Sequence, residues 1–138
     1  MKKQNIVITA ADKTELESIL DVAGKISERA EYEFRGLRGE VERAAVVPSD
    51  QIPPDVITLN STAELLDLQT GEVIRLTVVL PRNAQIEHGE ISIFTSLGTA
   101  MLGYRVGDTF EWPIPYGIRR LKVIKLPFQP EEILRRAA

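Results

Sequence analysis

Two glutamates in one short segment have side chains of a type that could take part in metal chemistry. Glu28 and Glu31 lie three positions apart in the polar run KISERAE, residues 25–31. Carboxylate oxygens are hard ligands of the kind that Mg²⁺ prefers. Lys25 and Arg29 lie close to Glu28 in the sequence, and their positive charges would repel a metal cation. A solvated charged loop explains the segment as well, so we predict no metal and no cofactor.

A second group of candidate residues is aromatic and would serve contacts with another protein. Trp112 and Tyr116 flank Pro113 and Pro115, and this run could form an exposed ridge or could pack within the fold. Protein interfaces are enriched in Trp and Tyr. A basic cluster follows on the next predicted strand: Arg119, Arg120, Lys122 and Lys125. This cluster is either the solvent face of a sheet or a contact for an acidic partner surface.

The composition limits the classes of protein to which these residues can belong. The chain has 138 residues, of which 43% are hydrophobic, so it can form an ordinary packed domain. A net charge of −3 argues against direct binding of DNA or RNA, and the absence of cysteine excludes disulfides and thiolate metal sites. No apolar run approaches the roughly 18 residues of a membrane span. We therefore expect a cytoplasmic protein with no membrane partner.

One stretch, Glu90 to Asp108, organises the elements that must position these side chains. It predicts a strand, a short helix, a turn and the entry to another strand. Ser96 occupies the expected N-cap position of the helix, and Gly103 occupies its expected end in a left-handed conformation. A helix this short is unstable alone in water, so we predict that it lies on a sheet.

Two helices are predicted before this stretch. Residues 1–9 favour an extended strand, and a helix begins near Asp12, with Asp12 or Thr14 as its cap. A second helical pattern covers residues 34–44. Two helices of about 12 residues would each be about 18 Å long, and we expect them to pack as a short antiparallel hairpin. Three prolines within residues 47–55 then mark a joint.

After the joint the pattern changes to short strands. They are predicted at residues 56–59, 63–68, 73–80, 109–112 and 118–128. We therefore predict an α+β fold in two domains. Residues 1–50 would form the short helical hairpin, and residues 51–138 would form an antiparallel sheet with one short helix.

The second half of the chain resembles the carboxy-terminal domain of the Gre-type transcript cleavage factors, which has an FKBP-like fold. The family pattern is I-S-x-x-x-P-L-G-x-A-L-L-G-x-x-x-G-D. This chain keeps Ile91, Ser92, Leu97, Gly98, Ala100, Leu102, Gly103, Gly107 and Asp108. Ser96 replaces the proline of the pattern. The resemblance extends from Asp55 to Phe128, and the short hairpin and proline-rich joint are similar to the Rnk branch of the family.

The resemblance also implies a role for the segment between the two helices. Gre factors carry D-x-x-E-N-A-E-Y at the tip of their helical hairpin, and two acidic residues there help to hold a catalytic Mg²⁺ in the active site of RNA polymerase. Glu28 would match the glutamate, but Lys25 stands at the aspartate position. The resemblance therefore implies a transcription elongation regulator that binds RNA polymerase near its secondary channel and competes with Gre factors. It would not be an enzyme, and it would meet DNA only through polymerase.

The expected contacts with the partner form two sets. The set at the tip of the helical hairpin is Lys25, Glu28, Arg29, Glu31 and Tyr32. The set in the second domain is Phe94, Leu97, Tyr104, Trp112 and Tyr116. Three alternatives remain open: a Gre-like stimulator of transcript cleavage, a peptidyl-prolyl isomerase, or a protein that binds another partner such as a kinase. For the isomerase, the scattered aromatic residues do not assemble an evident proline pocket.

Overall fold

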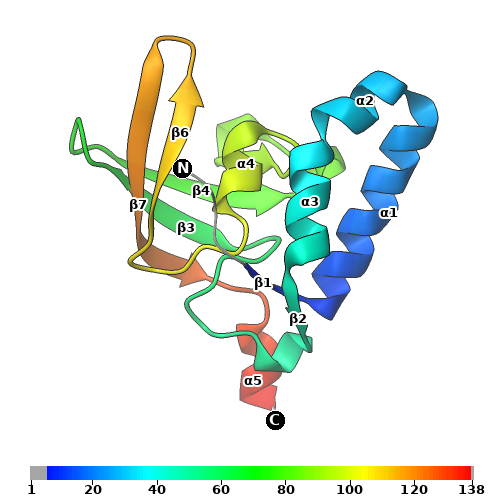
Figure 1. The fold of residues 1–138 in the computed structure, drawn as a ribbon. Helices are drawn as coiled ribbons and strands as arrows, with labels where there is room; N and C mark the ends of the chain where they lie inside the picture. Colours follow the sequence, from blue (N-terminus) through cyan, green and yellow to red (C-terminus); the bar gives the residue numbers. More distant parts are fainter. Residues whose placement is uncertain (1–5, 138) are drawn as a thin grey trace.

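The fold is a mixed α+β arrangement, as predicted, and the computed structural model describes residues 6–137, without the side chain of Ala137 (Figure 1). The first elements are β1 (Val7–Thr9), α1 (Ala10–Ile26), α2 (Glu28–Glu33), α3 (Arg35–Arg43), β2 (Ala45–Val47) and a 3₁₀ turn (Ser49–Gln51). β1 and β2 pair in parallel, so the three helices form one crossover between them. Figure 1 shows α1 and α3 side by side, with α2 joining their upper ends. The part of the predicted first strand in residues 1–5 lies outside the described residues.

Helix α1 begins earlier and ends later than predicted. The Thr9 hydroxyl oxygen accepts a hydrogen bond from the backbone N–H of Asp12 at 3.0 Å, so Thr9 is the cap. The expectation of Asp12 or Thr14 as the cap was wrong, because Asp12 lies inside the helix and its carboxylate accepts from Leu59 N instead. The helix continues through Gly24 and has 17 residues. At 1.5 Å per residue it is about 25 Å long rather than about 18 Å.

The polar segment between the helices is largely helical rather than a loop. The Ser27 hydroxyl accepts hydrogen bonds from Arg29 N at 3.1 Å and Ala30 N at 3.3 Å, which caps α2. Helix α3 then buries Leu37 and Val41 at a spacing of four, as the sequence pattern indicated.

The second half contains a five-stranded sheet in the order β5-β4-β3-β7-β6. Its strands are β3 (Thr62–Asp67), β4 (Val73–Val79), β5 (Glu90–Ser92), β6 (Thr109–Ile114) and β7 (Gly117–Phe128). The remaining elements are α4 (Ser96–Met101), α5 (Glu132–Ala137) and two 3₁₀ turns (Pro81–Asn83 and Ile86–His88). The prediction of an antiparallel sheet was wrong at one edge, where β5 pairs in parallel with β4. The two 3₁₀ turns carry the chain back along β4, and this return sets the parallel direction.

Two local predictions in this half were also wrong. Residues 56–59 do not form a strand: they are buried, and Val56 makes only an isolated bridge to Arg105. Burial in the core rather than strand pairing explains their apolar side chains. Thr95, not Ser96, caps α4, because its hydroxyl accepts from Gly98 N at 3.0 Å. Gly103 does adopt the predicted left-handed conformation, with φ of +83°, and Ile6 fills the space where a side chain would lie.

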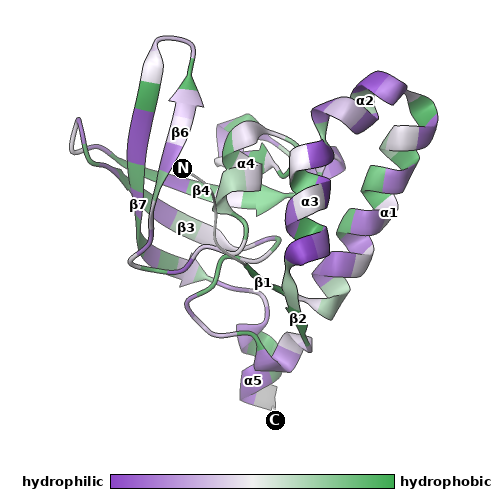
Figure 2. Ribbon diagram, in the orientation of Figure 1, coloured by the Kyte–Doolittle hydropathy of each residue, from purple (hydrophilic) through white to green (hydrophobic). Residues whose placement is uncertain are grey.

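One apolar cluster joins the two halves. Ile8, Leu16 and Leu37 from the first half belong to the same buried cluster as Met101 and Phe110 from the second. Figure 2 shows α1 and α3 alternating between hydrophilic and hydrophobic residues, as amphipathic helices do. The predicted joint therefore does not separate two independent cores. In residues 6–137, every helix is too short or too polar to span a membrane.

Candidate functional site

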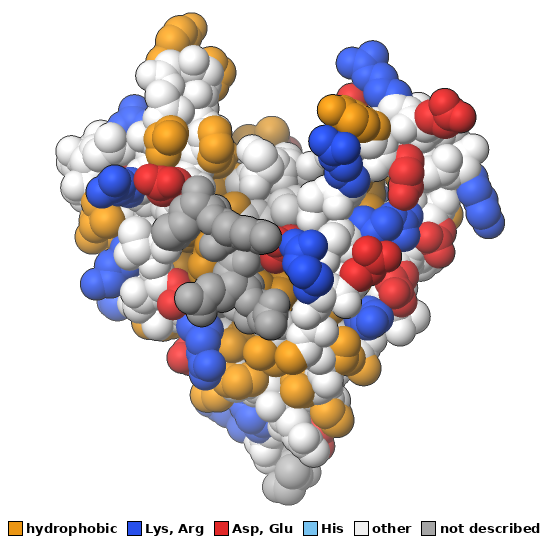
Figure 3. Space-filling view, viewed as in Figure 1, with side chains coloured by type: hydrophobic (Ala, Val, Ile, Leu, Met, Phe, Trp, Pro, Cys, Tyr) orange, Lys and Arg blue, Asp and Glu red, His pale blue; other side chains and the backbone are white. Residues whose placement is uncertain are grey.

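The candidate contact residues lie on and between two projections. Figure 3 shows the molecule as a V, with the α1–α2 end forming one arm, the β6–β7 hairpin forming the other, and a hollow between them. Lys25, Glu28 and Tyr32 belong to the helical arm, and Tyr116 lies at the end of the hairpin arm. The structure therefore does not bring the two predicted sets together into one patch.

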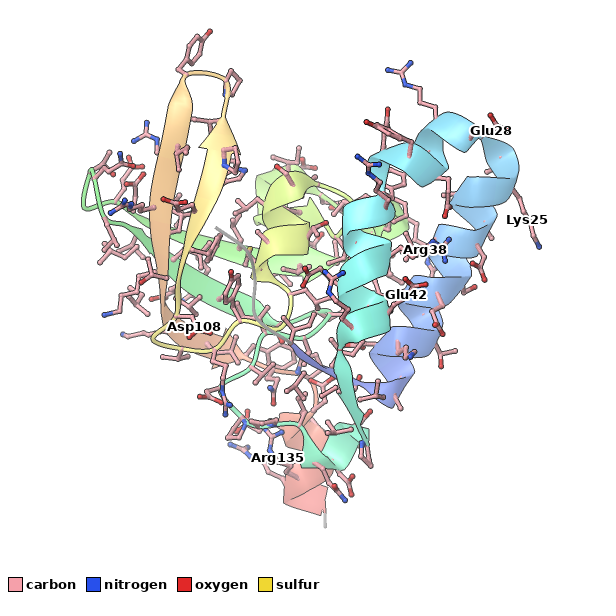
Figure 4. The ribbon with its side chains drawn as sticks, viewed as in Figure 1. Lys25, Glu28, Arg38, Glu42, Asp108 and Arg135 are labelled. Carbon is pink, nitrogen blue, oxygen red and sulfur yellow. The ribbon has the colours of Figure 1, made fainter. Side chains whose placement is uncertain are left out.

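At the helical arm, Lys25 and Glu28 are exposed and lie at its outer end, directed away from the sheet (Figure 4). Neither forms an ion pair within the described residues. A lone carboxylate beside a lysine is a weak ligand set for a divalent cation. Across residues 6–137, no three Asp, Glu, His or Cys side chains are grouped so that they could hold a metal ion. The end of this arm therefore presents one exposed cation and one exposed carboxylate.

Glu31, the second candidate acid, turns back into the helices. Its Oε1 lies 2.8 Å from Nε of Arg38, and its Oε2 accepts a hydrogen bond from Nη2 of Arg38 at 3.2 Å. Nη1 of Arg38 also donates to Asp21 at 3.2 Å. The hydrogen bond to Glu31 is the main reason why the pKa of Arg38 is raised. One guanidinium therefore connects α1, α2 and α3, and the carboxylate of Glu31, although 44% exposed, is paired with Arg38.

The other two predicted contacts at this arm are at its surface. Arg29 forms an exposed ion pair with Glu33 at 2.9 Å, one turn along α2. Such exposed pairs contribute only about 0.3–0.5 kcal/mol, so Arg29 is readily available to another acidic group. The Tyr32 ring is 64% exposed and has the Arg35 guanidinium 4.3 Å from its centroid. This cation–π pair holds an aromatic face at the surface.

Three of the predicted contacts in the second half have structural roles, and two of them, Phe94 and Tyr104, also remain partly exposed. Leu97 is only 8% exposed and belongs to the core, so the expectation of a surface contact at Leu97 was wrong. Phe94 stacks on Phe34 with ring centroids 4.0 Å apart, which attaches the start of α3 to the turn before α4. Tyr104 stacks on Phe110 at 4.9 Å, and partial burial raises the pKa of the Tyr104 hydroxyl.

The two aromatic residues of the predicted aromatic–proline ridge have different environments: Trp112 packs against the fold, and Tyr116 is exposed. Trp112 is half-buried, and its indole N–H donates to the Ser96 hydroxyl at 3.1 Å. Ser96 is the residue that replaces the proline of the family pattern, and a proline could not accept this bond. Tyr116 is 97% exposed at the end of the hairpin.

Sequence reasoning missed two groups of residues that shape this region. Arg38 and Phe34 hold the helical arm together and attach it to the body, yet their partners come from other elements, and Phe94 is 60 positions from Phe34. Asp12 is buried, and this burial is the main reason why the pKa of its carboxyl is raised to about 7. The hydrogen bond from the backbone N–H of Leu59 lowers the pKa, and the negative charge of Glu131 adds to the rise. No local pattern marks either group, because each depends on contacts between distant parts of the chain.

Comparison with known proteins identifies the family. Residues 52–127 match the family described as "Transcription elongation factor, GreA/GreB, C-term". The chain is 36% identical over 96 residues to the regulator of nucleoside diphosphate kinase of Escherichia coli (strain K12), covering 69% of this chain and 71% of that protein. It is 29% identical over 115 residues to transcription elongation factor GreA of Alkaliphilus oremlandii (strain OhILAs), covering 75% and 72%.

A solved structure shows the same relationship in three dimensions. This chain is similar to the prokaryotic transcription elongation factor GreA/GreB from Nitrosomonas europaea, with a TM-score of 0.74 and 32% sequence identity. The similar region covers 91% of this chain and 100% of that chain. Together with the sequence match over more than half of the residues, this similarity confirms the predicted resemblance. The chain belongs to the GreA/GreB family of transcription elongation factors.

Proposed function

We propose that this protein binds RNA polymerase near its secondary channel and competes there with Gre factors, without stimulating transcript cleavage. Family membership supports a role in transcription elongation, since the relatives are named as elongation factors. The proposed site of action is the cytoplasm, and DNA is met only through polymerase. We interpret residues 1–50 as the unit that carries a short coiled-coil hairpin and residues 51–138 as an FKBP-like unit, with one apolar cluster shared by both.

The observation that carries the proposal is the charge at the end of the helical arm. Lys25 stands where the family pattern has an aspartate, and Glu31 is held by Arg38 at 2.8 Å. Only Glu28 of the candidate acids projects freely at the end of this arm. A cation beside that carboxylate disfavours a bound divalent metal, so the arm is better suited to occupying a site than to delivering a metal to it.

The reach of the arm supports the same function. The Phe34–Phe94 stack fixes the start of α3 to the body. Beyond this stack lie only the six-residue α2 and the outer end of α1. A projection of this size fills the entrance of a channel more readily than it reaches the bottom of one.

Two measurements on the full chain test the proposal. Binding to purified core polymerase, with and without a competing Gre factor, should show saturable binding that the competitor displaces. In backtracked elongation complexes with Mg²⁺, the chain should slow cleavage stimulated by a Gre factor and should stimulate none itself. Cleavage that depends on Glu28 would instead support the alternative of a Gre-like stimulator, and an absence of binding would favour a different partner.

A further inference from the structure

We propose that the end of the β6–β7 hairpin, residues 113–118, is an anchor that inserts into an apolar socket rimmed by acidic side chains on the partner protein. This inference rests on the proposed function, because it takes polymerase as that partner. The term hairpin tip here means residues 113–118 of this β-hairpin, where β6 turns into β7. The side chain expected to enter the socket is that of Tyr116.

The hairpin tip stands clear of the rest of the sheet. β7 pairs with β3 only as far as Leu121 opposite Asp67, and Leu68 N then donates to Arg120 O at 2.9 Å. Beyond that point, within the described residues, β6 and β7 pair only with each other, ending at Ile114 opposite Gly117. Figure 1 shows this end of the hairpin projecting past the other strands. A partner can therefore surround the tip without meeting the rest of the sheet.

The hairpin tip carries large apolar side chains that the formation of a turn does not require. Tyr116 is 97% exposed and Ile118 is 52% exposed, and Pro113 and Pro115 are exposed beside them. Single exposed apolar residues are ordinary, but a contiguous group on a projection is typical of an interaction site.

The neighbouring β3–β4 turn shows how this chain makes a turn with polar chemistry. There the Asp67 carboxylate accepts from Gln69 N at 2.8 Å and from Thr70 N at 3.2 Å, and Gly71 takes a φ of +79°. Polar side chains, glycine and proline are the usual choice for such turns, so the prolines and Gly117 of the hairpin tip are explained by the turn itself. The exposed side chains of Tyr116 and Ile118 call for another explanation, and contact with a partner supplies one.

The hairpin is also rigid before it binds. Continuous pairing from Thr109 opposite Lys122 to Ile114 opposite Gly117 fixes the backbone, and the two prolines restrict it further. The hydrogen bond from Trp112 to Ser96 braces the hairpin against α4. An aromatic side chain on a rigid support loses little conformational freedom on binding, which favours affinity.

The charge of the hairpin indicates the chemistry of the socket. Residues 109–128 contain four Lys and Arg and one Glu, whereas the rest of the chain contains 13 Lys and Arg and 19 Asp and Glu. A basic hairpin on an otherwise acidic protein is complementary to a surface with excess carboxylates. Such complementarity orients the hairpin as it approaches, while the apolar tip supplies the buried contact.

The same residues favour a protein over a nucleic acid as the partner. Arg119 already pairs with Asp67 at 3.4 Å, and Arg120 lies 3.5 Å from Glu111. Both pairs are long, and the two arginine side chains are 39% and 65% exposed, so they can exchange these acids for acidic side chains of a partner. The tip itself carries no charge. A site for phosphates would place free cations around Tyr116.

The test is the binding of fluorescently labelled full-length chain to core polymerase free of nucleic acid, using Tyr116→Ser. We expect the dissociation constant to rise at least about tenfold, as for loss of an aromatic anchor at an interface. The matched control is Leu68→Ser, which removes an apolar side chain that is 48% exposed beside the β3–β4 turn. This control should change binding by less than about twofold, and Ile118→Ser should weaken it as Tyr116→Ser does.

The outcomes separate the inference from the proposed function. If the unaltered chain binds polymerase and Tyr116→Ser binds equally well, the anchor is refuted while the proposed function stands. If the unaltered chain does not bind, both are refuted. If Tyr116→Ser weakens binding only when a nucleic-acid scaffold is present, the tip contacts nucleic acid and the protein socket is refuted. Unchanged melting of the variant, followed by circular dichroism, would confirm that it folds.

Discussion

Replacing the buried Asp12 by asparagine should change how the stability of this protein depends on pH. Asp12 is 8% exposed, and its Oδ2 accepts a hydrogen bond from Leu59 N at 3.0 Å. The carbonyl oxygen of asparagine can accept the same bond and occupies nearly the same volume. The substitution therefore removes the ionisation of the side chain while it keeps the contact that joins α1 to the segment before β3.

The size of the effect follows from the shift in pKa. Burial, with a contribution from Glu131, raises the pKa of Asp12 from 3.8 to about 7. The folded protein thus holds the proton more tightly than the unfolded chain, so the stability that this proton provides is fully present below pH 3.8 and is lost as the pH rises to about 7. At about 1.4 kcal/mol per unit of pKa, the loss is about 4 kcal/mol. Asparagine cannot ionise and avoids this loss.

Urea unfolding of both proteins at several pH values measures the effect. The free energy of unfolding of Asp12→Asn minus that of the unaltered chain should rise by about 4 kcal/mol between pH 4 and pH 8. Acids that do not interact with Asp12 titrate in the same way in both proteins and cancel in this difference. Glu17→Gln, an exposed change on the same helix, is the control for loss of a negative charge. A difference that stays within about 1 kcal/mol across this range would refute the reasoning.

Three further substitutions test the contacts that hold the two arms. Phe34→Ala removes the stack on Phe94 and should lower the free energy of unfolding by about 2 kcal/mol, less than for a fully buried ring; unchanged urea unfolding would contradict this. Arg38→Gln leaves two carboxylates without their cation and should cost about 1 kcal/mol at low salt and less in 1 M NaCl, whereas a cost independent of salt would rule out an ionic origin. Thr95→Ala should cost about 1 kcal/mol in thermal unfolding because it removes the cap of α4, and an equal loss from Thr95→Ser, which keeps the capping hydroxyl, would contradict this reason.

Patterns local in the sequence predicted much of this fold. The alternation of buried and partly exposed residues in β3 and the long β7 were recognisable. The spacing of Leu37 and Val41 likewise identified α3. The turn at Gly103 was predictable because few other residues tolerate its φ.

Features that depend on distant partners could not be predicted in this way. The parallel pairing of β5 depends on the path of two 3₁₀ turns, and the buried segment at residues 56–59 has the same composition as a strand. At the helical arm, the sequence indicated which acid is missing, but not that Glu31 would be held by Arg38. Tyr116 and Trp112 looked equivalent in the sequence, but Trp112 is half-buried and hydrogen-bonded to Ser96, whereas Tyr116 is 97% exposed.

The parallel pairing of β1 with β2 has a consequence for how proteins of this architecture can diversify. The chain leaves for the helices at Thr9 and returns at Ala45, and the strands at these two points are hydrogen-bonded neighbours. Insertions of matched length in α1 and α3 would therefore lengthen the helical projection without moving its base. The length of the helical projection can therefore change while the rest of the fold stays the same.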